Sequence, residues 1–237
     1  MKAIPAVDLR EGCCVQLVGG SYAEERVRLD DPVAVARHWG EIGFSTLHVV
    51  DLDAALGQGD NVGLIARILA LPGLEVSVGG GVRTGDQIDA LLEAGASRVV
   101  VGTRAIEDPE WLEAMAAQFP RRLIVAADVR GREIVTRGWT IAGGIEVAPY
   151  LILLEMVPLA GVLVTAVHQE GRLAGPDLPL IRDCVSAASV PLIASGGIAS
   201  IEDIRALQGA GAASAVLGMA LYTGAVDPAA VAREFAA

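Results

Sequence analysis

The sequence predicts a single (β/α)8 barrel, the TIM-barrel class of α/β fold, made of half-barrels over residues 1–120 and 121–237. Two observations lead to this prediction. Eight short apolar runs alternate with stretches of helical periodicity, as parallel strands and their connecting helices do. Several chemical landmarks also recur after 114 to 120 residues, about half of the 237-residue chain. The length itself is usual for such a barrel, which typically has about 250 residues.

The eight apolar runs are mostly continuous rather than alternating, which is typical of strands buried on both faces of a parallel sheet. In order, the predicted strands are AIPAV (3–7), TLHVV (46–50), EVSVG (75–79), RVVVG (98–102), LIVAAD (123–128), GVLVT (161–165), VPLIAS (190–195) and SAVLG (214–218). Apolar residues at helical spacing between these runs predict helices over 31–43, 85–96 and 200–212. Asp31 is expected to cap the first helix, with Pro32 at its first position.

The internal repeat distinguishes a closed barrel from an open doubly wound sheet. The cluster Gly79–Gly81 recurs as Ser195–Gly197, and Gly102 recurs as Gly218, each after 116 residues. The aspartates that end two strands, Asp8 and Asp128, lie 120 residues apart. Two four-stranded halves can complete each other's sheet edges by closing, so the repeat favours the barrel.

Composition excludes several classes of protein. The net charge of −11 argues against a nucleic-acid partner. No apolar run approaches about 18 residues, so no membrane span is expected, and the N-terminus is interpreted as a first strand rather than a signal peptide. Three cysteines without a framework spacing suggest free thiols in a reducing, cytoplasmic environment. No obligate protein partner is evident from the sequence.

The repeated glycines predict two phosphate sites on one face of the barrel. Glycine allows the backbone to come close to a ligand, and free N–H groups at a helix N-terminus bind phosphate well. Loops that follow the strands gather at one end of a barrel. The predicted sites are Gly79, Gly80 and Gly81 with Gly102 and Thr103, and Ser195, Gly196 and Gly197 with Gly218 and Met219. Two such sites suggest a small-molecule substrate with a phosphate at each end. The alternative is that these glycines only form tight turns.

Acidic residues close two of the buried strands and are the first candidates for catalysis. Asp8 follows AIPAV and Asp128 follows LIVAA. A carboxylate beside an apolar strand is costly unless it is used or paired. A pair of carboxyl groups at a barrel mouth suits general acid–base catalysis, with one protonated and one ionised. The alternative is that each caps a loop or pairs with Arg10 or Arg130.

Other polar residues receive more modest interpretations. Asp51 and Asp53 are expected to bond neighbouring loops, and no metal site is expected because no third ligand is evident nearby. His48 is expected in the core or lower barrel, whereas His168 falls in a mouth loop. Trp139 is expected either to pack or to cover a planar part of the substrate, aided by Arg137.

Together these segments resemble a known family over nearly the whole chain. The motifs are IPAVDLREG (4–12), HVVDLDAALG (48–57) with Asn61, VGGGVR (78–83), VVVGT (99–103), ADVRG (127–131), GW (138–139), TAVHQEG (165–171) and ASGGI (194–198). They resemble the ProFAR isomerase family of histidine biosynthesis, whose substrate is phosphoribosylformimino-5-aminoimidazole carboxamide ribotide (ProFAR). The resemblance implies a (β/α)8 barrel of two half-barrels and a bisphosphorylated substrate.

The resemblance also implies the reaction. It is an Amadori rearrangement of an aminoaldose to an aminoketose, an intramolecular redox isomerisation that needs no metal or redox cofactor. Asp8 would accept a proton, Asp128 would donate one, and Thr165 would orient the substrate. The loop after the sixth strand has Glu170-Gly171 where many members have Asp-Gly, so Glu170 is a further candidate for proton transfer. Gln16 stands where members often have Arg, and Ala166 replaces a common polar residue.

Three alternatives remain open. Some members also isomerise phosphoribosylanthranilate in tryptophan biosynthesis, and Arg137 could bind the anthranilate carboxylate. The sister cyclase that makes imidazole glycerol phosphate begins with Cys-Leu-Asp and has a Lys in the next segment. Here those places have Ala-Val-Asp and Gln16. The last alternative is a non-catalytic barrel that binds a phosphorylated ligand.

Overall fold

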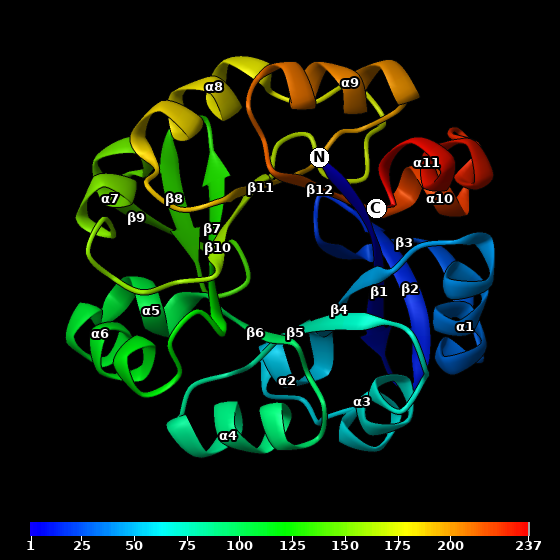
Figure 1. The fold of residues 1–237 in the computed structure, drawn as a ribbon, viewed down its shortest axis with the longest axis horizontal. Helices are drawn as coiled ribbons and strands as arrows, with labels where there is room; N and C mark the ends of the chain where they lie inside the picture. Colours follow the sequence, from blue (N-terminus) through cyan, green and yellow to red (C-terminus); the bar gives the residue numbers. More distant parts are fainter. Residues whose placement is uncertain (237) are drawn as a thin grey trace.

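Eight parallel strands form a closed barrel in the computed structural model, which describes residues 1–236 except the side chains of residues 22, 142 and 143. Around the barrel each strand pairs with the next, and the eighth pairing, between β7 and β10, closes the ring. The barrel strands are β1 (Lys2–Arg10), β4 (Thr46–Asp51), β5 (Glu75–Gly79), β6 (Arg98–Val101), β7 (Leu123–Arg130), β10 (Gly161–Ala166), β11 (Leu192–Ser195) and β12 (Ser214–Leu217). Figure 1 looks down this ring, with the helices outside it. The predicted fold class is therefore confirmed.

The strands bury both faces, as their continuous apolar runs predicted. Alternate residues point into the barrel and outward to the helices, because successive side chains of a strand point to opposite faces. The inward set is small and fills the barrel centre: Ile4, Ala6, Val100, Ile124, Leu163 and Val216. The outward set forms the larger core between the barrel and its helices, and Val7, Leu47 and Val99 in it are fully buried.

Eleven helices lie in the described part of the chain, and most cover the outside of the barrel (Figure 1). The longer ones are α1 (Pro32–Ile42), α3 (Val62–Leu69), α4 (Gly85–Glu93), α6 (Pro109–Gln118), α7 (Val147–Leu153), α8 (Leu178–Ala187), α9 (Ile201–Gly209) and α11 (Pro228–Phe235). Three short helices, α2 (Leu52–Leu56), α5 (Thr103–Glu107) and α10 (Met219–Tyr222), follow β4, β6 and β12 directly. The Asp31 cap is confirmed, since its side chain accepts hydrogen bonds from the backbone of Val33 and Ala34.

The backbone repeats its geometry after 116 residues. Gly80 and Gly196 both have φ of +100°. Gly102 (φ −111°, ψ −108°) and Gly218 (φ −104°, ψ −106°) cap the short helices α5 and α10 with nearly the same conformation. The N-caps of α4 and α9, Thr84 and Ser200, also lie 116 residues apart, and each forms a capping box. The repeated sequence landmarks therefore correspond to repeated local structures.

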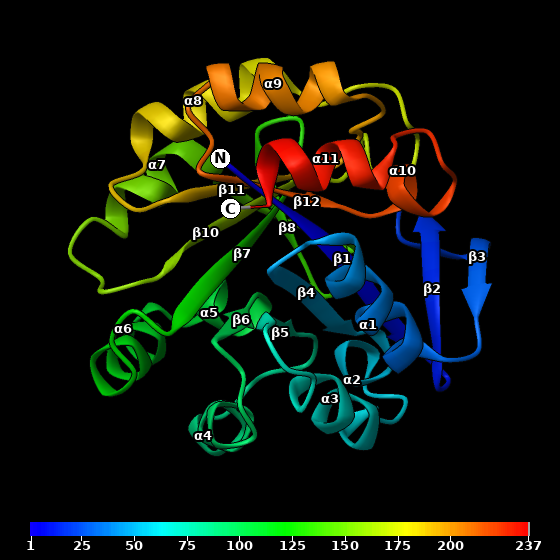
Figure 2. The same cartoon turned by 45° about the vertical axis from the view of Figure 1, so that its right-hand side comes forward.

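Four strands were not predicted, and they also come in two equivalent pairs. β2 (Cys13–Val18) and β3 (Ser21–Leu29) continue antiparallel from β1, while β8 (Glu133–Thr136) and β9 (Ile141–Glu146) continue antiparallel from β7. Figure 2 shows β2 and β3 side by side next to β1. Asp8 lies opposite Val15 and Asp128 lies opposite Val135, seven residues later in both cases. Each of these aspartates therefore has a β-hairpin beside it.

Candidate active site

The carboxyl ends of the parallel strands bring together the acidic residues that the sequence singled out. Asp8 lies near the end of β1, Asp128 near the end of β7, and Glu170 in the loop after β10. Thr165 on β10 is the direct register partner of Asp128 on β7. The Asp8 carboxylate accepts a hydrogen bond from Nε2 of Gln16, at 3.2 Å.

Burial changes the proton affinity of all three carboxyl groups. They keep some exposed surface toward the barrel mouth but lie too deep for full hydration. Burial raises the pKa of Asp8 to about 7, against a hydrogen bond from Gln16 that lowers it. Burial raises the pKa of Glu170 to about 7, and the negative charges of Asp8 and Asp128 add to this effect. Near neutral pH the cluster can therefore both accept and donate protons.

Asp128 is held differently from the other two. Burial raises its pKa, but hydrogen bonds from the side chains of Trp139 and Thr165 oppose the shift because they stabilise the carboxylate. The contacts do not support the alternative in which Arg10 or Arg130 pairs with Asp8 or Asp128. Arg10 forms an ion pair with Glu25 at 3.1 Å, and Arg130 donates to the backbone carbonyl of Trp139 at 3.3 Å.

The first glycine cluster is a tight turn against the loop after β4. Gly80 and Gly81 have positive φ, and a Cβ on them would overlap the carbonyl oxygens of Asp51 and Ala54. Next to this turn, Gly102 caps α5 and Thr103 is its first residue. The Thr103 hydroxyl accepts a hydrogen bond from the backbone N–H of Arg137, at 3.0 Å.

The second cluster lines a hollow that also contains a carboxyl group. Its walls are formed by the predicted residues Ser195, Gly196, Gly197, Gly218 and Met219, together with Glu170 and Gly171. A Cβ on Gly218 would overlap Oε1 of Gln16, the residue that also binds Asp8. Gln16 therefore connects one candidate acid directly to the second glycine cluster. These contacts of Gln16 could not be predicted from the sequence, because they depend on β2, a strand that was not predicted.

The two hairpins meet over the barrel mouth. Trp139 lies in the β8–β9 turn, and its ring packs so closely on Gly20 of the β2–β3 turn that a Cβ there would overlap it. The Gly20 contact was also missed, for the same reason as Gln16. Arg137 in the same turn forms a two-pronged ion pair with Glu107, at 3.0 and 3.1 Å. Trp139 packs on Gly20 and its side chain lowers the pKa of Asp128. That it covers a planar part of the substrate stays a prediction.

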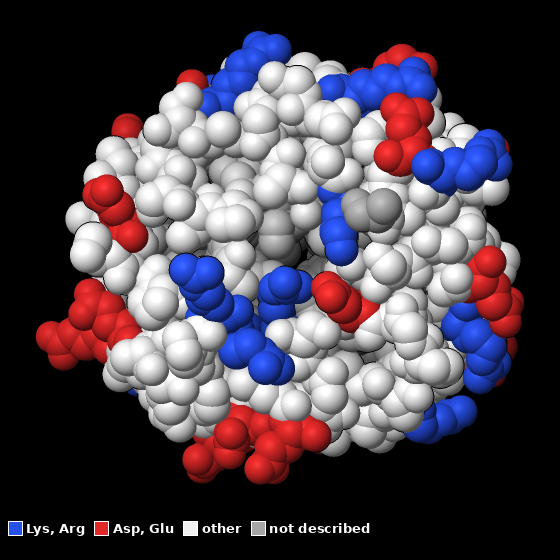
Figure 3. All heavy atoms as spheres, viewed as in Figure 1, with Lys and Arg blue, Asp and Glu red and all other residues white. Residues whose placement is uncertain are grey.

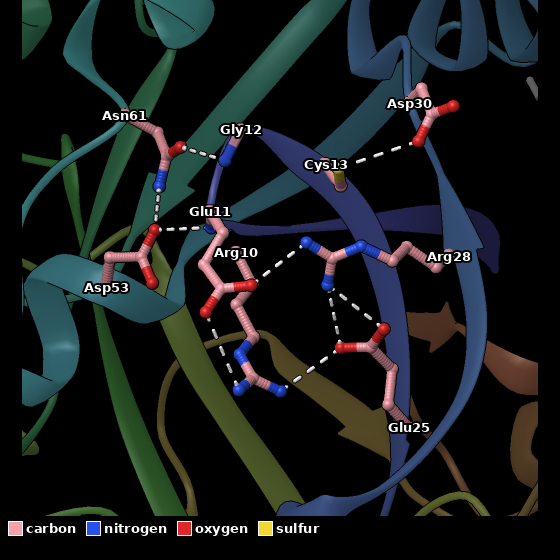
Figure 4. A network of polar contacts seen from close by, with 9 residues as sticks. All are labelled: Arg10, Glu11, Gly12, Cys13, Glu25, Arg28, Asp30, Asp53 and Asn61. Carbon is pink, nitrogen blue, oxygen red and sulfur yellow. Dashed lines mark hydrogen bonds and ion pairs between the residues drawn. The ribbon is translucent and has the colours of Figure 1, made fainter.

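Asp51 and Asp53 brace the loops beneath the mouth, as predicted. Asp51 accepts hydrogen bonds from the backbone and side chain of Asn61, at 2.7 and 2.8 Å. Asp53 accepts from the backbone N–H of Glu11, at 2.7 Å. Figure 4 shows how the bonds of Asp53 and Asn61 to Glu11 and Gly12 join the β1–β2 turn to the segment after β4. A chain of ion pairs among Arg10, Glu11, Glu25 and Arg28 extends the network to β3.

Two histidines lie as the sequence suggested. His48 is buried on β4, with Nδ1 3.1 Å from the Ser77 hydroxyl. His168 lies in the loop after β10, with Nε2 3.2 Å from a carboxylate oxygen of Asp177. Within residues 1–236, no group of three or more His, Cys, Asp or Glu side chains could hold a metal ion, and no helix could cross a membrane.

Comparison with known proteins places this geometry in a family. The family model described as "Histidine biosynthesis protein" matches residues 2–227. The chain belongs to the histidine biosynthesis protein family. The match covers every barrel strand and all the candidate site residues, from Asp8 on β1 to Met219 after β12.

Relatives within the histidine biosynthesis family match over the full chain. Proteins of Myxococcus xanthus and Gemmatimonas aurantiaca are 57% and 56% identical over 237 residues, covering 100% of both chains. A protein of Methanothermobacter thermautotrophicus is 40% identical over 228 residues, covering 96% of this chain and 95% of its own. All three are named 1-(5-phosphoribosyl)-5-((5-phosphoribosylamino)methylideneamino) imidazole-4-carboxamide isomerase. The similarity therefore extends across both predicted half-barrels.

Proposed function

We propose that this chain is the isomerase that converts the aminoaldose ProFAR to its aminoketose by general acid–base catalysis. The observation that carries the proposal is a pair of half-buried aspartates at equivalent places in the barrel, both with raised pKa values, near two glycine clusters. Full-length relatives at 57% and 56% identity carry the name of this isomerase. The substrate has two phosphoribosyl groups, which matches the number of clusters.

Each glycine cluster would bind one phosphate. Around Gly81, Gly102 and Thr103, the backbone N–H groups at the start of α5 and the Thr103 hydroxyl supply donors. Around Gly196, Gly197 and Gly218, the start of α10 supplies the equivalent donors in the second hollow. The two phosphates would hold the substrate across the mouth, with its reacting ribose between the acids. Such fixed positioning lowers the entropic part of the barrier.

The chemistry requires a proton to be given and another to be taken. Asp128 would protonate the ring oxygen as the C1–O bond breaks, producing an open-chain Schiff base. Asp8 would then remove the C2 proton, so that the C2–H electron pair forms the C1=C2 bond while the C1=N electron pair moves onto nitrogen. The resulting enolamine becomes the aminoketose when C1 gains a proton and the C2 hydroxyl loses one. A pKa of about 7 suits Asp8 as a base at neutral pH. Thr165, beside Asp128 in the register, would orient the substrate.

Trp139 would control the proton on Asp128. In the substrate-free protein its side chain donates to Asp128, which favours the ionised form that cannot act as an acid. A substrate entering between the hairpins would displace the ring from Gly20 and remove that donor. The pKa of Asp128 would then rise, and it would become protonated when the substrate is bound. In this scheme Asp128 is the proton donor.

Glu170 is the third acid of the proposed site. Its Oε2 atom is buried and has no hydrogen-bond partner among the described residues. Its backbone carbonyl accepts from the N–H of Gly19, at 2.9 Å, which holds the loop beneath the β2–β3 turn. Glu170 would exchange protons with the substrate or with Asp8. The negative charge of Asp8 already raises the pKa of Glu170.

The alternatives receive no support. For phosphoribosylanthranilate, the guanidinium of Arg137 would have to leave Glu107 before it could bind a carboxylate. A protein that only binds a phosphorylated ligand has no need for three carboxyl groups with raised pKa values. The deciding experiment is turnover of purified protein with ProFAR and with phosphoribosylanthranilate. The proposal requires conversion of ProFAR, and binding without conversion would refute it.

A further inference from the structure

A second cavity lies at the other end of the barrel, where the parallel strands begin. Its volume is about 200 Å³. Polar side chains from the starts of four strands line its rim, among them Lys2, Thr46, His48, Glu75, Ser77 and Arg98. The inward-facing barrel layer, including Ile4, Leu163 and Val216, forms its apolar floor. A cavity of about 150 Å³ can hold benzene, so this one has room for a small organic molecule.

Thr46 places a buried hydroxyl without a protein partner at the cavity. Its side chain is only 7% exposed, and Oγ1 has no hydrogen-bond partner among the described residues. A buried hydroxyl without a partner is costly, and such groups in native proteins require an explanation. Because Thr46 lines the cavity, a molecule inside it can supply the missing bond.

His48 presents a defined acceptor to the same space. The Ser77 hydroxyl donates to the backbone carbonyl of Leu47, at 3.2 Å, so its oxygen accepts the proton of His48 Nδ1. Burial lowers the pKa of His48 to about 4, which keeps the ring neutral. Nε2 is then an acceptor, and within the described chain no side chain or backbone group donates to it. A ligand in the cavity can therefore donate a hydrogen bond to Nε2 of His48.

The rim has two basic side chains, Lys2 and Arg98, and one acidic side chain, Glu75, although the protein as a whole is strongly acidic. Figure 3 shows Lys and Arg side chains around the central hollow and an acidic side chain among them, whereas the other acidic groups on this face lie further out. Arg98 pairs only loosely with Glu75, at 3.7 Å, and both side chains are exposed. Lys2 takes part in none of the ion pairs found among the described residues. An exposed pair of this kind contributes at most about 1 kcal/mol, so an anion can compete for Arg98.

We propose that this cavity binds a small carboxylate that also carries a hydroxyl or amino donor, that is, an α-hydroxy or α-amino acid. The carboxylate accepts from the Thr46 hydroxyl and lies near Lys2 and Arg98. The hydroxyl or amino group donates to Nε2 of His48, and a short alkyl group rests on the apolar floor. The proposal is independent of the isomerase reaction, because the barrel's inner layer separates this cavity from Asp8 and Asp128.

The test is a binding titration followed by NMR at the histidine side chains. Protein labelled with ¹⁵N-histidine gives signals from only His38, His48 and His168. The probes are L-lactate and L-alanine, with propionate lacking the donor and 1,2-propanediol lacking the carboxylate. Lactate or alanine should shift the His48 Nε2 signal saturably, with a Kd of about 10 mM or lower, and both control compounds should bind at least tenfold more weakly.

Matched variants test the residues. Thr46→Val should weaken the probe at least tenfold, because a hydrogen bond to a charged group is lost. Thr46→Ser should retain binding, and Arg121→Gln, outside the cavity lining, should leave it unchanged. If Thr46→Val fails to fold, the double variant Lys2→Gln and Arg98→Gln replaces it and should likewise weaken binding of the probe. No saturable His48 shift, equal binding of propionate, unchanged affinity in Thr46→Val, or a shift confined to His168 at the mouth would each overturn the proposal.

Discussion

The side chain of Trp139 lies close enough to Asp128 to lower the pKa of that carboxyl group, while its ring packs against Gly20. One residue of the β8–β9 turn thus contacts a candidate acid and the hairpin from the opposite half of the chain. If substrate moves the Trp139 ring away from Gly20, as proposed above, the pKa of Asp128 should change with it.

Replacing Trp139 with Phe separates the two contacts. Phe keeps an aromatic ring for Gly20 but has no N–H, so the pKa of Asp128 should rise in the substrate-free protein. Because the proposed donor acts in its protonated form, the alkaline limb of the pH profile of kcat/KM should move to higher pH. Steady-state rates between pH 5 and 9 provide the measurement. A profile identical to that of the unmodified protein would disprove the link.

Removing the Gln16 amide tests the hydrogen bond to Asp8. In Gln16→Met the side chain keeps its length but cannot donate, so the pKa of Asp8 should rise above about 7. The proposed base acts in its ionised form, and the acidic limb of kcat/KM should therefore move to higher pH. Gln58→Met, on an exposed loop, is the control and should leave the limb in place. An unmoved limb in Gln16→Met would separate Gln16 from the function of Asp8.

The pH dependence of stability tests the burial of Glu170. Its folded pKa of about 7 lies above the unfolded value near 4.5, so the folded state binds more protons between these values. The free energy of unfolding should therefore fall as pH rises from about 4 to 7. Glu170→Gln should remove this pH dependence. The effect of the substitution on the free energy of unfolding should therefore be more favourable at pH 8 than at pH 4, by about 1–3 kcal/mol. Urea unfolding of both proteins at pH 4 and pH 8 measures this difference. An equal effect of Glu170→Gln at the two pH values would contradict a raised pKa of Glu170.

Glycine substitutions distinguish close approach from simple turns. Gly81→Ala places a side chain at positive φ against the Ala54 carbonyl, so it should destabilise the fold by about 1–3 kcal/mol and raise KM for the bisphosphate substrate. Gly63 in α3 has open space around it, and Gly63→Ala should stabilise the fold by up to about 1 kcal/mol without changing KM. Thermal unfolding and kinetics of both variants provide the comparison. Normal KM in Gly81→Ala would refute a phosphate contact there.

The sequence predicted the parallel barrel well because its strands are buried on both faces. Each run, such as RVVV at β6, is recognisable without knowing its neighbours. The hairpin strands follow a different pattern. β3 has the sequence SYAEERVRL, half exposed and charged, and its pairing with β2 is shifted by an irregularity near Leu17. Residues whose roles depend on these strands, Gln16 and Gly20, could not be placed, whereas Asp8 and Asp128 could, since a carboxyl group after an apolar run is visible locally.

The most direct test of the paired-acid account is single-turnover conversion of ProFAR by Asp8→Asn and by Asp128→Asn. An isosteric amide keeps the shape of the mouth but cannot exchange a proton, so each variant should bind ProFAR with nearly normal affinity and convert it about 10²- to 10⁴-fold more slowly. Asp89→Asn, an exposed aspartate on α4, should convert it at the normal rate. Near-normal conversion by either paired variant would contradict the account.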